Sequence, residues 1–170
     1  MQYHMFYREE NEIAKTAQYY DPERIFDVLD CYAELGCAIQ ITELTIPAYR
    51  YTPEDEKIQA EIVKNLYRMW FSHPAMEGIV YWNLVDGFAF AAEQGDMTAG
   101  ENYYHGGLIR YDFTPKPAYF AVKELFEKTW RTNLCLDSGN SSELMFKGFY
   151  GQYELTATAT YSDGTTAPIE

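Results

Sequence analysis

The stretch Ala38-Ile39-Gln40-Ile41-Thr42-Glu43-Leu44 combines an apolar strand pattern with a carboxylate near its end. Its β-branched and apolar residues predict a buried strand. Burial of a carboxylate costs several kcal/mol unless a partner compensates, so Glu43 is a candidate functional residue. A strand-end glutamate that faces solvent is the alternative that this stretch alone leaves open.

Strand and helix patterns alternate on both sides of this stretch. Upstream, a strand is predicted over 2–7 and a helix over 22–35, the latter with Asp21 as its cap and Pro22 in its first position. Downstream, a helix is predicted over 53–72, a strand over 78–84 and a third helix after Pro115. Strands joined through helices of this length imply a parallel sheet with right-handed crossovers.

The predicted fold class is α/β, namely the last three strand-helix units of a (β/α)8 TIM barrel followed by a short all-β segment. No Gly-rich phosphate-binding motif follows any of the three strands, which argues against a nucleotide-binding sheet. A complete barrel needs roughly 250 residues, whereas this chain has 170. Three units cannot close, so we expect the C-terminal portion of a barrel whose N-terminal part is missing from this sequence.

The sequence pattern changes after the third predicted helix, from alternating strands and helices to a polar stretch followed by short strand patterns. We expect barrel structure over 1–131, a polar linker over 132–142 and a truncated β-rich appendage over 143–170, with short strands over 144–151 and 153–161. Threonine alternates with alanine or tyrosine in the second of these strands, and the Ser-Asp-Gly sequence that follows it is a turn signal. The appendage is interpreted as a structural prop, with carbohydrate binding as the alternative.

Composition restricts the kinds of partner. The formal net charge of −13 argues against nucleic acid and anionic membrane surfaces, and no segment has the apolar length of a membrane span. Aromatic residues make up 17% of the chain, which suits a neutral sugar whose C–H faces stack on rings. No cofactor is expected.

The three cysteines have no metal-ligand spacing, and their odd number excludes complete internal pairing. Cys31 and Cys37 are expected to be buried free thiols, and the disulfide state of Cys135 is open.

Polar and aromatic residues occur at all three predicted strand ends. Gln2 and His4 lie on the first strand, Glu43 on the second and Trp82 on the third. In a parallel barrel these side chains point into the same mouth. His4 and Trp82, each taken alone, fit ordinary core packing, but with a strand-end carboxylate they resemble a sugar site.

Several segments resemble glycoside hydrolase family 10, the endo-1,4-β-xylanases built on a (β/α)8 barrel. The resemblance runs from residue 1 to about 130, in the order and spacing of the family's last three units. The matching segments are Met1-Gln2-Tyr3-His4, Ile41-Thr42-Glu43-Leu44, Phe71-Ser72-His73-Pro74-Ala75, Gly78-Ile79-Val80-Tyr81-Trp82-Asn83-Leu84-Val85-Asp86-Gly87, Gly106-Gly107-Leu108-Ile109 and Thr114-Pro115-Lys116-Pro117-Ala118-Tyr119.

This resemblance implies that Glu43 is the nucleophile of a retaining mechanism and that His4 orients it. Gln2 is a neighbour on the same barrel face, and Trp82 forms the platform beneath the sugar. Phe90 falls where the family often has a second tryptophan, which makes it a further substrate-binding candidate.

Two departures from the family pattern are expected to matter. Thr45 replaces the aspartate that usually partners the histidine, so it supplies a hydrogen bond but no charge. The general acid/base comes from an Asn-Glu pair on an earlier strand of the family barrel, and no residue before Met1 supplies it. Asp86, Glu93 and Glu101 are interpreted as solvated or rim residues, so this fragment alone is expected to be inactive.

The leading hypothesis is therefore a fragment of a retaining endo-1,4-β-xylanase that binds xylan or xylo-oligosaccharide. A non-catalytic carbohydrate-binding or scaffold protein on a decayed barrel is one alternative, and a retaining glycosidase for another β-glycan is a second. Secretion is expected, because xylan is an insoluble extracellular polymer.

Overall fold

The computed structural model describes residues 1–7 and 11–169, and it divides the chain into two compact units, Met1–Thr129 and Trp130–Glu170. Residue 170, the last of the predicted appendage, lies outside the described residues. None of the helices in the described residues combines the length and the apolarity that a membrane span requires.

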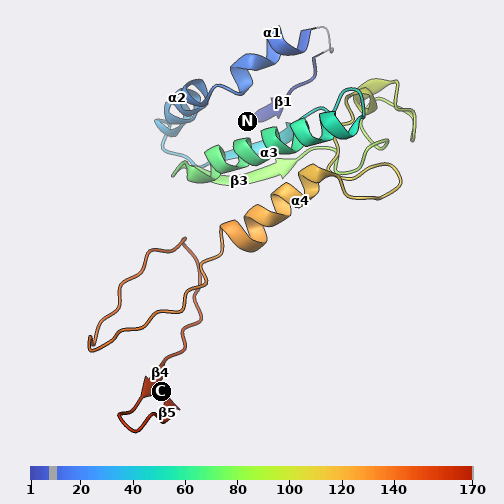
Figure 1. Ribbon diagram of the computed structural model, residues 1–170. Helices are drawn as coiled ribbons and strands as arrows, with labels where there is room; N and C mark the ends of the chain where they lie inside the picture. The colour runs from blue at the N-terminus through green and yellow to red at the C-terminus, as the bar shows by residue number, and fades with distance from the viewer. Residues whose placement is uncertain (8–10, 170) are drawn as a thin grey trace. The chain divides into compact units, whose positions relative to one another are not determined.

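The first unit is a parallel sheet of three strands in the order β1-β2-β3 (Figure 1). Its strands are β1 Gln2–His4, β2 Ile39–Thr45 and β3 Met76–Tyr81. The predicted strand order and parallel direction are thus confirmed. The sequence placed the ends of β1 and β3 up to three residues too far along the chain.

Two helices of the first unit, α2 and α3, begin at residues whose side chains cap them. The elements are α1 Glu12–Thr16, η2 Ala17–Tyr19, α2 Pro22–Ala33, α3 Pro53–Ser72, η3 Gly100–Tyr104, α4 Pro117–Glu124 and the π-helical η4 Leu125–Thr129. The Asp21 carboxylate accepts a hydrogen bond from the amide of Glu23, and the Thr52 hydroxyl accepts one from the amide of Asp55. These side chains satisfy amides that have no partner within the helix.

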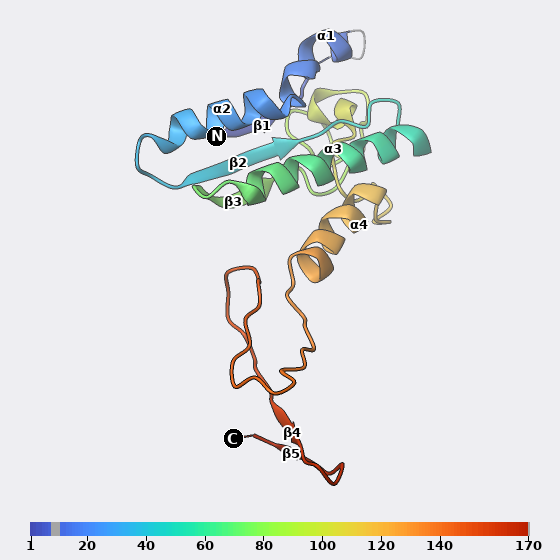
Figure 2. The same cartoon turned by 60° about the vertical axis from the view of Figure 1, so that its left-hand side comes forward.

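One face of the sheet is covered and forms the core. Figures 1 and 2 show α2 and α3 lying alongside the sheet. The core side chains include Met5, Ile25, Leu29, Ile39, Ile41, Leu44, Val63, Leu66 and Trp70. On the other face, Gln2, Gln40, Thr42 and Val80 are exposed in the described residues.

The expectation that Cys31 and Cys37 are buried is wrong, because both side chains are exposed. All three cysteines are free thiols in the structure. The apolar stripe of α2 that reaches the sheet consists of Ile25 and Leu29, and Cys31 lies two residues beyond it, off this face.

The second unit contains one antiparallel pair, β4 Thr158–Thr160 and β5 Thr166–Pro168. The predicted turn joins them: Gly164 has a φ of 84°, and the Asp163 carboxylate accepts hydrogen bonds from the amide and hydroxyl of Thr165. The strand predicted over 144–151 does not form, and its residues are exposed. A strand needs a hydrogen-bonding neighbour, and the described part of the chain pairs none with this segment.

Candidate active site

Pairing between β1 and β2 brings four polar side chains onto one face of the sheet. Gln2 lies opposite Glu43, and His4 lies opposite Thr45. The Gln2 amide donates a hydrogen bond to Oε1 of Glu43 at 2.8 Å, and Nε2 of His4 lies 2.8 Å from Oε2 of Glu43. The predicted adjacency of Gln2, His4 and Glu43 therefore exists in the structure, and each carboxylate oxygen has its own partner.

A bulge in β2 turns Glu43 onto this face. Ile41 pairs with Ile79 and Leu44 with Tyr81, so β2 has one more residue than β3 in this interval. Without the extra residue, Glu43 would share the helix-covered face of Ile41, because strand side chains alternate. The expectation of a buried strand glutamate is corrected accordingly: the Glu43 side chain is 24% exposed on the open face.

The hydrogen bonds to Glu43 set its charge. The bond from His4 is the main cause that lowers the pKa of the Glu43 carboxyl below its ordinary value of 4.5, and the bond from Gln2 adds to it. Partial desolvation acts in the opposite direction without cancelling these bonds. Glu43 is thus ionised at neutral pH, as a carboxylate nucleophile must be.

His4 is held on several sides. Its Nδ1 atom lies 3.1 Å from the hydroxyl of Thr45, which is itself fully buried. The Phe6 ring stacks on the imidazole at a centroid distance of 4.6 Å, and the Trp82 ring meets it edge-on at 6.0 Å. Phe6 was missed as a site residue, although strand alternation already placed it on the same face as His4.

Trp82 is oriented by a carboxylate that the sequence did not assign to the site. The indole Nε1 of Trp82 and the amide of Asn83 each donate a hydrogen bond of 2.8 Å to Oε2 of Glu101. The interpretation of Glu101 as a solvated rim residue is therefore incomplete. No local pattern could have found this contact, because it joins residues 19 positions apart across an irregular loop.

Phe90 is 70% exposed. Its backbone carbonyl accepts a hydrogen bond from the amide of Glu101 at 3.0 Å, so its loop is tied to the carboxylate that orients Trp82. The structure thus places the backbone of Phe90 near the Trp82 support and leaves its ring open to solvent.

Asp86 is a buried residue, and the expectation that it is solvated is wrong. Its carboxylate lies 2.6 Å from Nζ of Lys116, and both side chains are inaccessible to solvent. The other carboxylate oxygen accepts a hydrogen bond from the amide of Gly107 at 2.7 Å. Burial raises the pKa of Asp86 and lowers that of Lys116, and their mutual attraction opposes both shifts. This pair anchors the loop after β3 to the backbone of His105 and Gly107.

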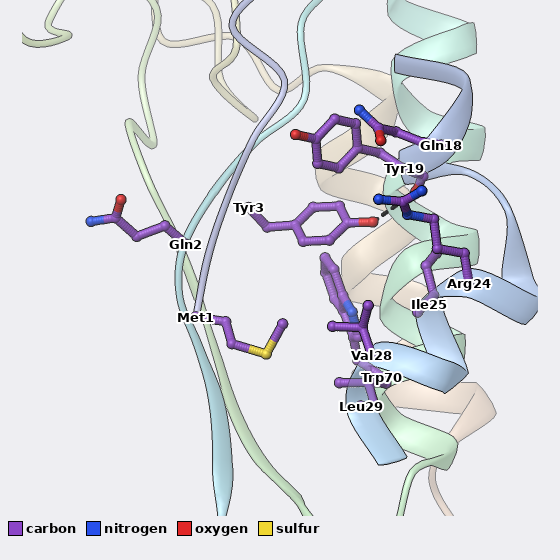
Figure 3. Close-up of a pocket in the computed structure, with 10 residues that line it drawn as sticks. All are labelled: Met1, Gln2, Tyr3, Gln18, Tyr19, Arg24, Ile25, Val28, Leu29 and Trp70. Atoms are coloured by element: carbon purple, nitrogen blue, oxygen red, sulfur yellow. Dashed lines mark hydrogen bonds between the residues drawn. The ribbon is translucent and has the colours of Figure 1, made fainter. Parts of the chain in front are cut away.

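A cavity of about 190 Å³ lies between β1, α2 and α3 (Figure 3). Tyr3 points into it, donates a hydrogen bond to the carbonyl of Tyr19 at 2.8 Å and meets the Trp70 ring edge-on. Gln2 points away from the other side chains in Figure 3. Because Gln2 is the residue that contacts Glu43, this cavity belongs to the helix-covered face and not to the carboxylate site.

Among residues 1–7 and 11–169, no cluster of three or more histidine, cysteine, aspartate or glutamate side chains is placed to hold a metal ion. The chemistry available at the site is that of a hydrogen-bonded carboxylate beside an imidazole and an indole.

The parallel sheet thus brings a carboxylate, a histidine and a tryptophan together near its strand ends. The model of glycosyl hydrolase family 10 matches residues 1–125. The chain belongs to this family and contains part of its catalytic domain.

Two curated proteins are similar to part of this chain. Endo-1,4-beta-xylanase B of Thermotoga neapolitana is 30% identical over 104 residues, which are 59% of this chain and 28% of the relative. The anti-sigma-I factor RsgI6 of Acetivibrio thermocellus is 29% identical over 131 residues, 77% of this chain and 15% of the relative. The chain thus spans less than a third of either curated relative.

A solved structure provides the corresponding fold comparison. Xylanase 10B of Thermotoga petrophila RKU-1 in complex with xylobiose is 27% identical to this chain, with a TM-score of 0.51. The similarity covers 64% of this chain and 32% of the xylanase. The first unit therefore corresponds to part of a family 10 TIM barrel.

Proposed function

We propose that this chain supplies the nucleophile portion of a retaining endo-1,4-β-xylanase, with Glu43 as the residue that forms the glycosyl-enzyme. The observation that carries the proposal is the double hydrogen bonding of the Glu43 carboxylate by Gln2 and His4 on the open face of the sheet. Both bonds favour the anion and fix its direction, which a covalent mechanism requires.

In the proposed mechanism, one oxygen of Glu43 attacks the anomeric carbon of the xylose in the −1 subsite, and the glycosidic bond to the leaving oxygen breaks. A second carboxylic acid protonates that leaving oxygen and later removes a proton from the water that attacks the glycosyl-enzyme. We assign the second carboxyl to a barrel strand that precedes β1 in the family and that this sequence does not include. Trp82, oriented by Glu101, would form the platform beneath the sugar.

The substrate class rests on the relatives. A xylanase 10B of the same family was solved with xylobiose, so xylan or xylo-oligosaccharide is the proposed ligand. Secretion is proposed with it, because the polymer is insoluble and extracellular. A retaining glycosidase for a different β-glycan remains a variant of the same proposal, and a polysaccharide panel distinguishes the two.

A non-catalytic carbohydrate-binding or scaffold protein is the second candidate. One relative is named an anti-sigma-I factor and not an enzyme, and Phe90 stands exposed where the family often has tryptophan. This candidate predicts glycan binding without a covalent intermediate.

Covalent labelling of the complete protein tests both candidates. A 2-deoxy-2-fluoro xylobioside with a dinitrophenolate leaving group needs little acid assistance, so labelling reports on the nucleophile. The xylanase proposal predicts that Glu43 displaces the dinitrophenolate and that the peptide containing Glu43 gains the mass of one 2-deoxy-2-fluoroxylobiosyl group. Glu43→Gln should abolish the label, and Glu77→Gln, an exposed control on β3, should retain it. Binding of xylo-oligosaccharide without any label would favour the non-catalytic candidate.

A further inference from the structure

Gly106 lies directly against the side chain of Thr45. A Cβ atom added at Gly106 would overlap with Cγ2 of Thr45, far inside van der Waals contact. The φ angle of Gly106 lies outside the left-handed region, so its backbone would accept alanine. The requirement for glycine at this position therefore comes from the contact with Thr45.

The backbone of residues 105–107 is fixed and cannot retreat from Thr45. Buried side chains of α3, of the loop after β3 and of the residue that precedes α4, together with the Tyr81 hydroxyl, hold it by hydrogen bonds. These bonds join Lys116 Nζ to the carbonyl of His105 at 2.7 Å, the Tyr81 hydroxyl to the carbonyl of Gly106 at 2.9 Å, the Gln59 amide to the carbonyl of Gly107 at 3.3 Å and the Gly107 amide to Oδ1 of Asp86 at 2.7 Å. The segment 105–107 thus forms a rigid wall.

The two branches of the Thr45 side chain face different neighbours. Its methyl group meets the wall at Gly106, and its hydroxyl lies 3.1 Å from Nδ1 of His4. A β-branched side chain has few allowed χ1 values, and each value places both branches at once. The wall that fixes the methyl group therefore also fixes the direction of the hydroxyl.

The hydrogen-bond roles along this chain of contacts follow from Glu43. An ionised carboxylate only accepts hydrogen bonds, so the proton between His4 Nε2 and Glu43 belongs to Nε2. In a neutral imidazole Nδ1 is then the acceptor, and the hydroxyl of Thr45 must donate to it. With a neutral His4 ring, a hydrogen bond from this hydroxyl to Nδ1 is compatible only with the tautomer that donates from Nε2 to Glu43.

We propose that Gly106 is a positioning residue: its backbone sets the rotamer of Thr45, and the Thr45 hydroxyl then holds the His4 imidazole in the orientation that directs the Glu43 carboxylate. The proposal rests on the proposed function only for the statement that Glu43 is the nucleophile. The series of contacts from Gly106 through Thr45 and His4 to Glu43, here called the relay, is a property of the described residues.

A pair of compensating substitutions in the full chain tests this relay. Gly106→Ala should push Thr45 away from the wall, break its bond to His4 and raise the pKa of the Glu43 carboxyl toward its ordinary value. Thr45→Ser in the same protein removes the methyl group that collides and keeps the hydroxyl, so the double variant should recover the parent titration. The readouts are the carboxyl ¹³C titration of Glu43 and the ¹⁵N signals of the His4 ring.

Gly107→Ala is the matched control. A Cβ atom there would lie 2.7 Å from the amide nitrogen of Asp86, and its three nearest atoms belong to Asp86 and Val85 and not to Thr45. Thr45→Ser should therefore fail to compensate for Gly107→Ala. In the complete enzyme, a misplaced reacting group costs on the order of 10²-fold in rate, and Gly106→Ala should lower kcat by up to about that factor, with recovery in the double variant.

The proposal is wrong if the Glu43 carboxyl of folded Gly106→Ala has the same pKa as in the parent protein. It is also wrong if the addition of Thr45→Ser does not reverse the shift in this pKa. If Gly106→Ala does not fold, Thr45→Val decides: it keeps a methyl group against the wall and lacks the hydroxyl, so the Glu43 pKa should rise, and an unchanged pKa overturns the proposal.

Covalent labelling of Glu43 in the complete protein is a separate measurement that tests only the nucleophile role. If Thr45→Ser restores the Glu43 titration but Glu43 is not labelled, the positioning role of Gly106 is supported and the nucleophile role of Glu43 is rejected. If Glu43 is labelled but Thr45→Ser does not restore the titration, the nucleophile role is supported and the positioning role is rejected.

Discussion

Nε2 of His4 lies 2.8 Å from Oε2 of Glu43, with the two residues on neighbouring parallel strands. The bond depends on strand register, because a shift of one residue would send one of the two side chains to the opposite face. It also depends on the bulge that turns Glu43 outward. The adjacency of His4 and Glu43 therefore follows from backbone pairing between β1 and β2.

Replacement of His4 by alanine should raise the pKa of Glu43. The bond from His4 is the largest cause of the lowered value, and the bond from Gln2 is a smaller one. A ¹³C titration should show a larger rise for His4→Ala than for Gln2→Ala. Equal shifts in both variants, or a shift in neither, would contradict the assignment of His4 as the main support.

The same bonds predict an acid-side effect on folding. A carboxyl with a folded-state pKa below 4.5 contributes stability above pH 4.5 and loses that contribution as the pH falls through the folded value. The loss should be absent in Glu43→Gln, which cannot titrate. The check is the free energy of unfolding measured in urea from pH 5 downward, with the two proteins compared at each pH.

Removal of the Glu101 carboxylate should loosen Trp82. The single oxygen Oε2 accepts from both Trp82 and Asn83, and the loss of a hydrogen bond to a charged group costs about 1.5–3 kcal/mol. Glu101→Ala should therefore lower stability by about 1–3 kcal/mol and shift the indole N–H signal of Trp82. Glu101→Gln keeps one acceptor oxygen and should have a smaller effect. Glu93→Ala, at an exposed position on the same loop, is the control and should leave the Trp82 signal unchanged.

Local signals in the sequence predicted the parallel strands and the long helices. Thr52 and Pro53 placed the start of α3, and its end at Ser72 agrees with the stop predicted at Ser72-His73-Pro74. Strand ends also placed Gln2, His4 and Glu43 together, because parallel strands end at one edge. These features depend on residues adjacent in sequence or on simple alternation.

Features that depend on distant pairing were not predictable in this way. The bulge at Glu43 exists only in the register between β2 and β3. The support of Trp82 by Glu101 depends on a loop held by the Asp86–Lys116 pair, whose members are 30 positions apart in the sequence. The strand predicted over 144–151 failed for the opposite reason, since a favourable local pattern found no neighbouring strand.

Replacement of only one member of the buried Asp86–Lys116 pair should strongly lower the stability of the fold. Lys116→Met leaves the Asp86 carboxylate buried without its cation, and such a change costs about 3–5 kcal/mol. The double variant Asp86→Asn with Lys116→Met removes both charges and keeps an oxygen for the Gly107 amide, so it should be more stable than Lys116→Met alone. Urea unfolding measures both. Lys123→Met, which removes an exposed pair with Glu127, is the control and should cost about 0.5 kcal/mol or less.

His105 should make the protein less stable as the solution becomes mildly acidic. Burial, with the nearby Lys116 charge, lowers the pKa of His105 from 6.5 to about 4, and its Nδ1 atom has no hydrogen-bond partner in the structure. Between these two values the unfolded chain binds the proton and the folded chain does not, so stability falls as the pH drops from about 6.5 toward about 4. His105→Asn removes this titration and tolerates the φ of 46° at this position. The free energy of unfolding between pH 4.5 and 7 should therefore change less steeply with pH in His105→Asn than in the parent protein, and equal slopes in both would show that His105 does not contribute this titration.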